Sequence, residues 1–297
     1  MRETDRGDHV CEFPSIKFTV PTGEPVVPAK AEAVGERRWR LVVDANEKAL
    51  IDGALVRAEN AYERDDEAKA LEIMKELAER YPNNVQVLDE VAQMFRSYDE
   101  PRAARFFWKR AIETGMAGLP DDLLDRGWTL PYSFESNRNL LHSLNALAFL
   151  LMEEGDLPEA LELLEVLLDL DPEDAFVARA KILYCHFALQ QKDSALTLCE
   201  VHPEDPLVEI VFGRILALHQ SGRKEEARAR AAEAAKTHPL VVKELFRPSR
   251  HPRHSGDPQD HAWHYWHEFK RFWIASAGAI GMMKEAQRTA KQAAKHA

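Results

Sequence analysis

Apolar residues recur at helical spacing along this chain, in stretches that come in pairs. Residues 160–172 read A-L-E-L-L-E-V-L-L-D-L-D-P, which predicts an amphipathic helix that ends at Pro172, because proline cannot continue a helix. The stretch before it carries a complementary apolar stripe, formed by Leu144, Leu147, Ala148 and Leu151. A small residue such as Ala160 lets two antiparallel helices approach closely. The pattern therefore predicts a unit of two packed helices.

This unit repeats with a period of about 34 residues. The spacing of Ala160, Leu167 and Pro172 recurs upstream at Ala70, Leu77 and Pro82, and downstream at Ala227, Ala234 and Pro239. Two less regular copies are marked by Ala104 with Ala111 and by Ala195 with Cys199. One helix pair cannot bury both of its apolar faces, so the copies must stack into an α-solenoid.

The best-formed copy resembles the tetratricopeptide repeat (TPR), through Gly155-Asp156, Glu159-Ala160, Leu167 and Asp171-Pro172. Residues 222–239 give a second match, and the resemblance covers residues 51–239. It implies an all-α fold, a TPR-like right-handed α-solenoid of about five helix pairs with a C-terminal capping helix. A weaker likeness, to the suppressor-of-tumorigenicity family of TPR-like proteins, rests on Pro131-Tyr132, Asn137-Arg138 and the Trp-rich segment after the last repeat.

Three segments are expected along the chain. Residues 1–35 contain four prolines and predict an extended or disordered N-terminal arm. Residues 36–239 form the solenoid, with the helical pattern starting at Glu36. An aromatic insertion at 116–140 either lines the binding groove, which we favour, or lengthens one repeat as a plug. Residues 240–297 form a helical cap, in which one helical face carries Trp263, Trp266, Phe269 and Trp273 and docks on the last repeat.

The resemblance also indicates where a partner binds. TPR arrays line their concave surface with the first helix of each pair, and the residues there that do not pack between helices are candidates for contact. These candidate peptide-binding residues are Gln93, Arg96, His142, Asn145, Phe149, Met152, Tyr184, Phe187, Phe212 and His219, and Asp89 accompanies Gln93 and Arg96 in the second repeat. We expect a non-catalytic protein–protein interaction scaffold that binds a peptide or helix in this groove. The alternative is that the N-terminal arm or the insertion occupies the groove.

Composition narrows the choice of partner and compartment. The net charge of −11 over 297 residues argues against nucleic acid or an anionic membrane as the main partner. The three cysteines have no paired spacing, which predicts neither a disulfide framework nor a Cys-x-x-Cys metal site. The N-terminus lacks the apolar core of a signal peptide, and no apolar run approaches the roughly 18 residues that span a bilayer. We therefore expect cytoplasmic residence, while the oligomeric state is left open.

Two other functions are weighed against the scaffold. The sequence contains no phosphate-binding loop and no nucleophile elbow, so we expect no enzyme and no cofactor. The first alternative is a metal-binding protein or enzyme with its site in the His- and Trp-rich segment. That segment holds His251, His254, His261, His264 and His267, with Asp257, Asp260 and Glu268. The second is an RNA-associated adaptor that uses Arg37, Arg38 and Arg40 together with Arg247, Arg250 and Arg253.

Overall fold

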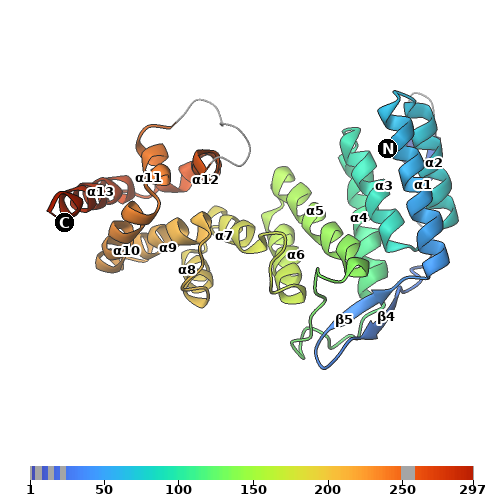
Figure 1. Ribbon diagram of the computed structural model, residues 1–297, viewed down its shortest axis with the longest axis horizontal. Coiled ribbons are helices and arrows are strands. Elements are labelled where there is room, and N and C mark those ends of the chain that lie inside the picture. Colours follow the sequence, from blue (N-terminus) through green and yellow to red (C-terminus); the bar gives the residue numbers. More distant parts are fainter. Residues whose placement is uncertain (1, 4–8, 13–16, 21–24, 249–257, 297) are drawn as a thin grey trace. The chain divides into compact units, whose positions relative to one another are not determined.

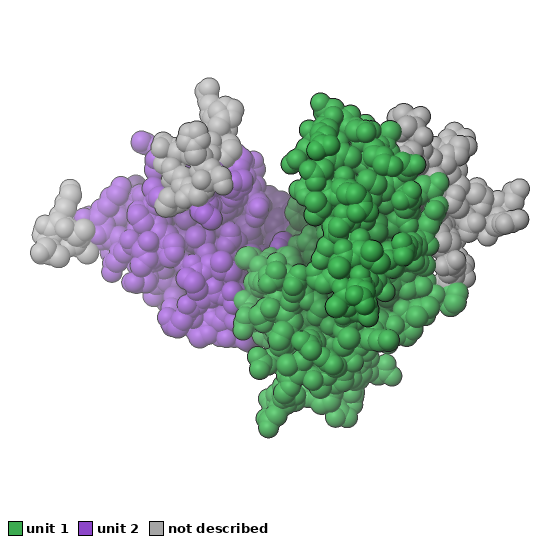
Figure 2. Space-filling model, turned by 45° about the vertical axis from the view of Figure 1, so that its right-hand side comes forward, with its two compact units in different colours: residues 1–178 green, residues 179–297 purple. Residues whose placement is uncertain are grey.

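Helices dominate the computed structural model, which describes residues 2–3, 9–12, 17–20, 25–248 and 258–296 (Figure 1). Most consecutive helices pack against each other, and the fold class is all-α. Contacts divide the chain into two compact units, Met1–Ala178 and Arg179–Ala297, shown in different colours in Figure 2. This division does not fall at either of the expected boundaries, 35/36 and 239/240, which stay predictions.

Unit 1 contains three helix pairs. The first helices of the pairs are α1 (Ala45–Glu63), α3 (Val85–Ser97) and α5 (Arg138–Glu154), and their partners are α2 (Glu67–Arg80), α4 (Pro101–Met116) and α6 (Leu157–Leu170). Local chemistry determines where these helices begin and end. The side chains of Asp44, Asp66 and Asn84 accept hydrogen bonds from backbone N–H groups at the starts of α1, α2 and α3. Gly155 ends α5 in the left-handed conformation (φ 86°).

Short strands precede the helices. β1 (Arg2–Glu3), β2 (His9–Glu12) and β3 (Lys17–Val20) form an antiparallel sheet in that order. β4 (Lys30–Ala33) pairs antiparallel with β5 (Trp39–Val42). The expectation of a helix from Glu36 was therefore wrong, because β4 and the backbone of Thr129 supply hydrogen-bond partners that keep this segment extended. The helical structure begins at Ala45.

The 116–140 insertion packs within unit 1. Leu123 and Leu130 are buried, and the backbone N–H of Leu130 donates to the carbonyl of Leu170. Trp128 stacks on Trp39, with ring centroids 5.7 Å apart. Its apolar side chains thus join the core beside β5 and the end of α6.

Unit 2 consists of helices only among its described residues. They are α7 (Ala178–Ala188), α8 (Lys192–Val201), α9 (Val208–Gln220), α10 (Lys224–Thr237), α11 (Pro239–Phe246), α12 (Pro258–Ala275) and α13 (Ala279–His296). Gly213 on α9 lies so close to α7 that an added Cβ would be 2.3 Å from Leu183. The aromatic residues Trp266, Phe269 and Trp273 of α12 are buried in one core with α8, α9 and α10. This confirms the interpretation of the Trp-rich segment as a docked capping helix.

Candidate functional site

A buried carboxylate organises the face of unit 1 formed by α3 and α5. Asp89 on α3 is only 1% exposed. Five side chains approach it: Trp108 Nε1 (3.2 Å), Ser143 Oγ (2.9 Å) and His142 Nδ1 (2.8 Å) at Oδ1, and Gln93 Nε2 (3.2 Å) and Asn139 Nδ2 (3.1 Å) at Oδ2. We call Asp89 and these five residues the Asp89 cluster. It links α3, α4 and α5, and it holds Gln93, Asn139 and His142 in defined orientations.

The Asp89 cluster shifts the titration of its neighbours. Burial lowers the pKa of His142, but its hydrogen bond to Asp89 and the negative charges of Asp89 and Glu90 outweigh that effect, so the pKa lies above its ordinary value. Burial, followed by the charge of Asp89, raises the pKa of Glu90. The face therefore combines a buried carboxyl group with a histidine whose pKa is raised.

This coupling predicts a pH dependence of stability. The pKa of His142 is higher in the folded than in the unfolded chain, so its stabilisation is complete below the unfolded-state pKa and is lost as pH rises through the folded-state pKa. We expect the difference in free energy of unfolding between wild type and His142→Gln to shrink as pH rises from about 5.5 to about 8.5. Urea denaturation at a series of pH values measures it. The difference reports His142 together with its charge coupling to Glu90, and a difference that grows with pH would contradict the assignment.

The predicted residues on α5 form a stripe along one side of the helix. His142 and Asn145 are partly exposed, as is Met152, whereas Phe149 is 49% exposed. Asn145 Oδ1 is buried and has no hydrogen-bond partner among the described residues. Position 145 therefore carries a buried, unsatisfied acceptor on the same side of α5 as the exposed ring of Phe149.

The two predicted residues on α3 lie against this stripe. Gln93 belongs to the Asp89 cluster, and Arg96 Nη2 donates to Glu153 Oε2 of α5 at 2.6 Å. The structure thus brings together the six predicted residues of unit 1 along α3 and α5.

The predicted residues of unit 2 are covered by the chain itself. Phe187 and Phe212 are 5% and 0% exposed, and Tyr184 is half-buried. All three contact aromatic rings of α12: Tyr184 and Phe187 meet Phe269 and Phe272, and Phe212 meets Tyr265. His219 Nε2 donates to the carbonyl of Ala277 at 2.8 Å. The expectation that Tyr184, Phe187 and Phe212 offer an open aromatic surface was wrong, because α12 packs against them. Phe187 and His219 also line a pocket beside α12.

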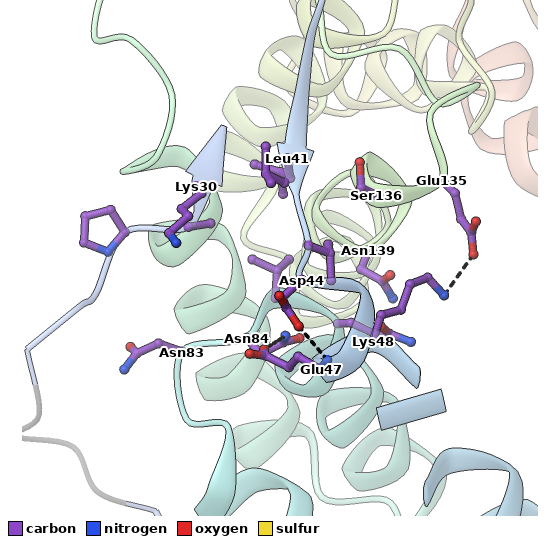
Figure 3. A pocket seen from close by; sticks show the side chains of 16 residues that line it. Lys30, Leu41, Asp44, Glu47, Lys48, Asn83, Asn84, Glu135, Ser136 and Asn139 are labelled. Carbon is purple, nitrogen blue, oxygen red and sulfur yellow. Dashed lines mark hydrogen bonds and ion pairs between the residues drawn. The ribbon is translucent and has the colours of Figure 1, made fainter. Parts of the chain in front are cut away.

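Unit 1 also contains a pocket of about 380 Å³ that the sequence pattern did not predict (Figure 3). Its polar lining includes Asn83, Asn84, Gln86, Asn139 and Lys48. Lys48 is already neutralised, since its Nζ lies 2.5 Å from Asp52 and 3.1 Å from Glu135. The only signal in the sequence was the cluster of amides at the start of α3, which the repeat pattern explains as helix capping.

Comparison with protein families identifies the chain. Residues 58–260, more than two thirds of its length, match the model of a family described as transcriptional repressor TCF25. The chain belongs to the Tcf25 family. The matched residues include α3 and α5 of unit 1 and α7 to α11 of unit 2.

Two solved structures are similar to this Tcf25-family chain. The TPR domain of P58(IPK) is 14% identical, with 84% of this chain and 67% of that chain covered and a TM-score of 0.33. A flexible tandem repeat domain that belongs to bacterial cellulose synthase is 15% identical, with 84% and 98% covered and a TM-score of 0.28. A comparison with curated proteins gives no match.

The histidine segment of the Tcf25-family chain forms no metal cluster in the part that the structure describes. His267 stacks on Trp263 with ring centroids 3.6 Å apart, and His264 Nε2 lies 3.5 Å from Asp260. No three His, Cys, Asp or Glu side chains gather closely enough to hold a metal within the described ranges. His251, His254 and Asp257 lie outside those ranges, so metal binding by the whole segment stays a prediction.

Two of the arginines proposed to bind RNA, Arg38 and Arg40, interact with other side chains of this protein. Arg40 pairs with Glu32 at 2.5 Å, and the guanidinium of Arg38 lies over the ring of Phe134. Arg250 and Arg253 fall outside the described residues, and RNA association stays a prediction. No helix in the described part of this Tcf25-family chain combines the length and the apolar character needed to cross a membrane.

Proposed function

We propose that this Tcf25-family protein is a non-catalytic scaffold, without a cofactor, that binds a segment of a partner protein on the α3–α5 face of unit 1. One observation carries the proposal: Phe149 is half exposed on α5, the helix that also carries His142 of the Asp89 cluster, whereas the predicted aromatic residues of unit 2 are covered by α12. Unit 2 supports the proposed mode of binding, because its first helices accept an aromatic helix from the same chain. Of the two predicted surfaces, that of unit 1 keeps its aromatic residue accessible.

The composition of this face resembles that of binding hot spots. Such sites combine an aromatic anchor with polar groups that are already oriented, so that little order must be imposed when the partner arrives. Phe149 supplies the anchor, and the Asp89 cluster orients Gln93 and His142.

The charge of the face suggests the chemistry of the partner segment. Asp89 and Glu59 act on Glu90 as like charges, and His142 acts on it as an opposite charge, so acidic groups outnumber basic ones around Glu90. A segment that places an apolar side chain on Phe149 and a Lys or Arg near Glu90 would complement it.

The family description extends this proposal to a biological setting. A scaffold in a family described as transcriptional repressor would hold proteins involved in repression, which favours nuclear partners. The cytoplasm, predicted from the sequence, is the other proposed location. The likeness to the suppressor-of-tumorigenicity family stays a prediction, since the matching family model is that of Tcf25.

Site-specific cross-linking tests the proposed surface. We expect benzoylphenylalanine at position 149 to form adducts with a partner protein in cells, and the same group at position 201 to form none. Val201 on α8 is a matched control because it is an exposed apolar residue, at 66% exposure, outside the proposed face. For the partner identified in the adduct, Phe149→Ala should weaken binding by at least about thirtyfold, the loss that defines a hot-spot residue. Equal adducts at both positions, or none at 149, would rule out this face.

A further inference from the structure

Unit 2 contains a second, more basic site. An open pocket of about 920 Å³ lies where the ends of α7, α9 and α12 meet the starts of α8 and α10. Its charged lining consists of Lys192, Lys224 and Arg271, with His219 beside them, and no Asp or Glu is among the lining residues. The whole chain has 50 acidic and only 39 basic residues. A pocket lined by cations alone therefore stands out from the rest of the protein.

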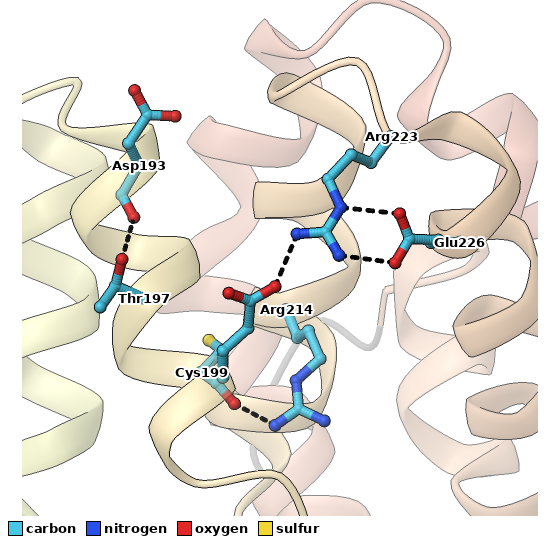
Figure 4. A network of polar contacts seen from close by, with 7 residues as sticks. Asp193, Thr197, Cys199, Arg214, Arg223 and Glu226 are labelled. Atoms are coloured by element: carbon cyan, nitrogen blue, oxygen red, sulfur yellow. Dashed lines mark hydrogen bonds and ion pairs between the residues drawn. The ribbon is translucent and has the colours of Figure 1, made fainter.

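The cations of this pocket are available for a ligand. None of the ion pairs between described residues includes Lys192, Lys224 or Arg271. The neighbouring Arg223 behaves differently, since it is held by Glu226 and Glu200 in the network shown in Figure 4. The turn between α9 and α10 thus neutralises one cation and leaves the next one, Lys224, without a carboxylate among the described residues.

Arg271 is held by aromatic rings in place of carboxylates. Its guanidinium lies 4.9 Å from the ring centroid of Tyr184 and 4.7 Å from that of Phe272. Stacking uses the flat face of the guanidinium and leaves the N–H groups at its edge free to donate to a carboxylate. Phe187 and Phe272, with centroids 5.4 Å apart, add an apolar floor beside it.

Two hydrogen bonds fix the wall of the pocket. Gln220 Nε2 donates to Ser276 Oγ at 2.8 Å, and His219 Nε2 donates to the carbonyl of Ala277 at 2.8 Å. Both join the end of α9 to the turn after α12. The pocket is consequently shaped before any ligand binds.

The positions of the two lysines do not serve helix stability. Lys192 and Lys224 are the first residues of α8 and α10, and neither helix has a side-chain cap. The N-terminus of a helix carries a partial positive charge, which disfavours a lysine there and favours an acidic residue. A binding role explains both residues where stability does not.

We propose that this pocket binds an acidic segment of a partner protein, with carboxylates on Lys192, Lys224 and Arg271 and an apolar side chain on the Phe187–Phe272 floor. The apolar floor favours a peptide over a free anion. A long polyanion such as RNA would be repelled by the surrounding chain, whose net charge is −11.

Fluorescence anisotropy with defined probes tests the proposal. The probes are a short fluorescein-labelled peptide rich in Asp and Phe, the same peptide with Lys in place of Asp, and a labelled single-stranded RNA of equal charge. We expect the Asp peptide to bind the full chain and the other two to bind at least about tenfold more weakly.

Charge reversal then locates the site. Lys192→Glu with Lys224→Glu should weaken binding of the Asp peptide by at least about tenfold and leave the melting temperature unchanged or raised. Lys236→Glu with Lys243→Glu is the matched control, because both lysines are exposed and lie outside the pocket, and it makes the same change in net charge. This control should keep most of the affinity.

Several results would overturn the proposal: no binding of the Asp peptide, equal loss in both double variants, or preferential binding of the Lys peptide or of RNA. The pocket is independent of the face proposed for unit 1. Cross-linking at position 149 should therefore survive Lys192→Glu with Lys224→Glu, so that either proposal can fail without the other.

Discussion

Asp89→Ala is expected to destabilise unit 1 by about 3–5 kcal/mol, the range typical when a buried charged network loses one partner. The carboxylate is 1% exposed, and its removal leaves the buried donors Trp108 Nε1 and Ser143 Oγ without their acceptor. Each unsatisfied buried donor costs about 1–3 kcal/mol, and water cannot easily replace an acceptor at a closed site. Hydrogen exchange of the α3 and α5 backbone, measured by mass spectrometry, reports the loss directly.

Two controls define what Asp89 contributes. Asp89→Asn keeps one acceptor oxygen but replaces the other by an NH₂ group, which cannot accept the hydrogen bonds from Gln93 and Asn139. We therefore expect a smaller loss of stability than for Asp89→Ala. The same change removes the negative charge that raises the pKa of His142, which should fall in an NMR titration. Glu165→Ala on α6 removes an exposed carboxylate and should have almost no effect on stability. If Asp89→Ala were as mild as Glu165→Ala, the cluster would not organise this face.

The helix pairs of this fold follow from the sequence because their pattern is local and repeated. Ala160 and Leu167 mark the predicted unit of two packed helices, and both are buried, as is Leu164 between them. The stripe of aromatic residues on 258–275 was similarly sufficient to predict a docked helix. Spacing along one helix determines which side is apolar, and an apolar side must be covered.

The strand at 39–42 could not be predicted from the periodicity of its residues. A run of four residues around Trp39 and Leu41 is too short for its period to separate helix from strand. Its conformation is decided by β4 and by Thr129, which lie outside the run and become neighbours only in the folded chain.

In the candidate site, too, contacts within one helix could be predicted and contacts between helices could not. The α5 stripe could be predicted, because Asn145 and Phe149 share a helix face whatever surrounds them. The Asp89 cluster could not, because its contacts join residues 50, 53 and 54 positions apart that no pattern relates. The spacing of Phe187 and Phe212 predicted that these rings need a partner, but not that α12 would be that partner.

The second large effect is expected for Trp273→Ala, which should destabilise unit 2 by about 3–5 kcal/mol. Trp273 is 0% exposed and its Nε1 donates to the hydroxyl of Tyr265 at 2.7 Å, so the substitution leaves both a cavity and a buried hydroxyl without its donor. Trp273→Phe keeps most of the packing and should cost clearly less. Trp263→Ala, at a half-buried position on the same helix, is the matched control for the loss of an indole ring.

Trp273→Ala should also affect the aromatic surface that α12 covers. Because α12 covers Phe187 and Phe212, its release should expose an aromatic surface and increase the fluorescence of an added apolar dye such as ANS well below the unfolding transition. Hydrogen exchange should rise first in α12 and in α9, against which it packs. Equal effects of Trp273→Ala and Trp263→Ala would instead mean that α12 does not depend on its buried tryptophan. The covered face of unit 2 would then have to be reconsidered as a binding surface alongside the exposed face around Phe149.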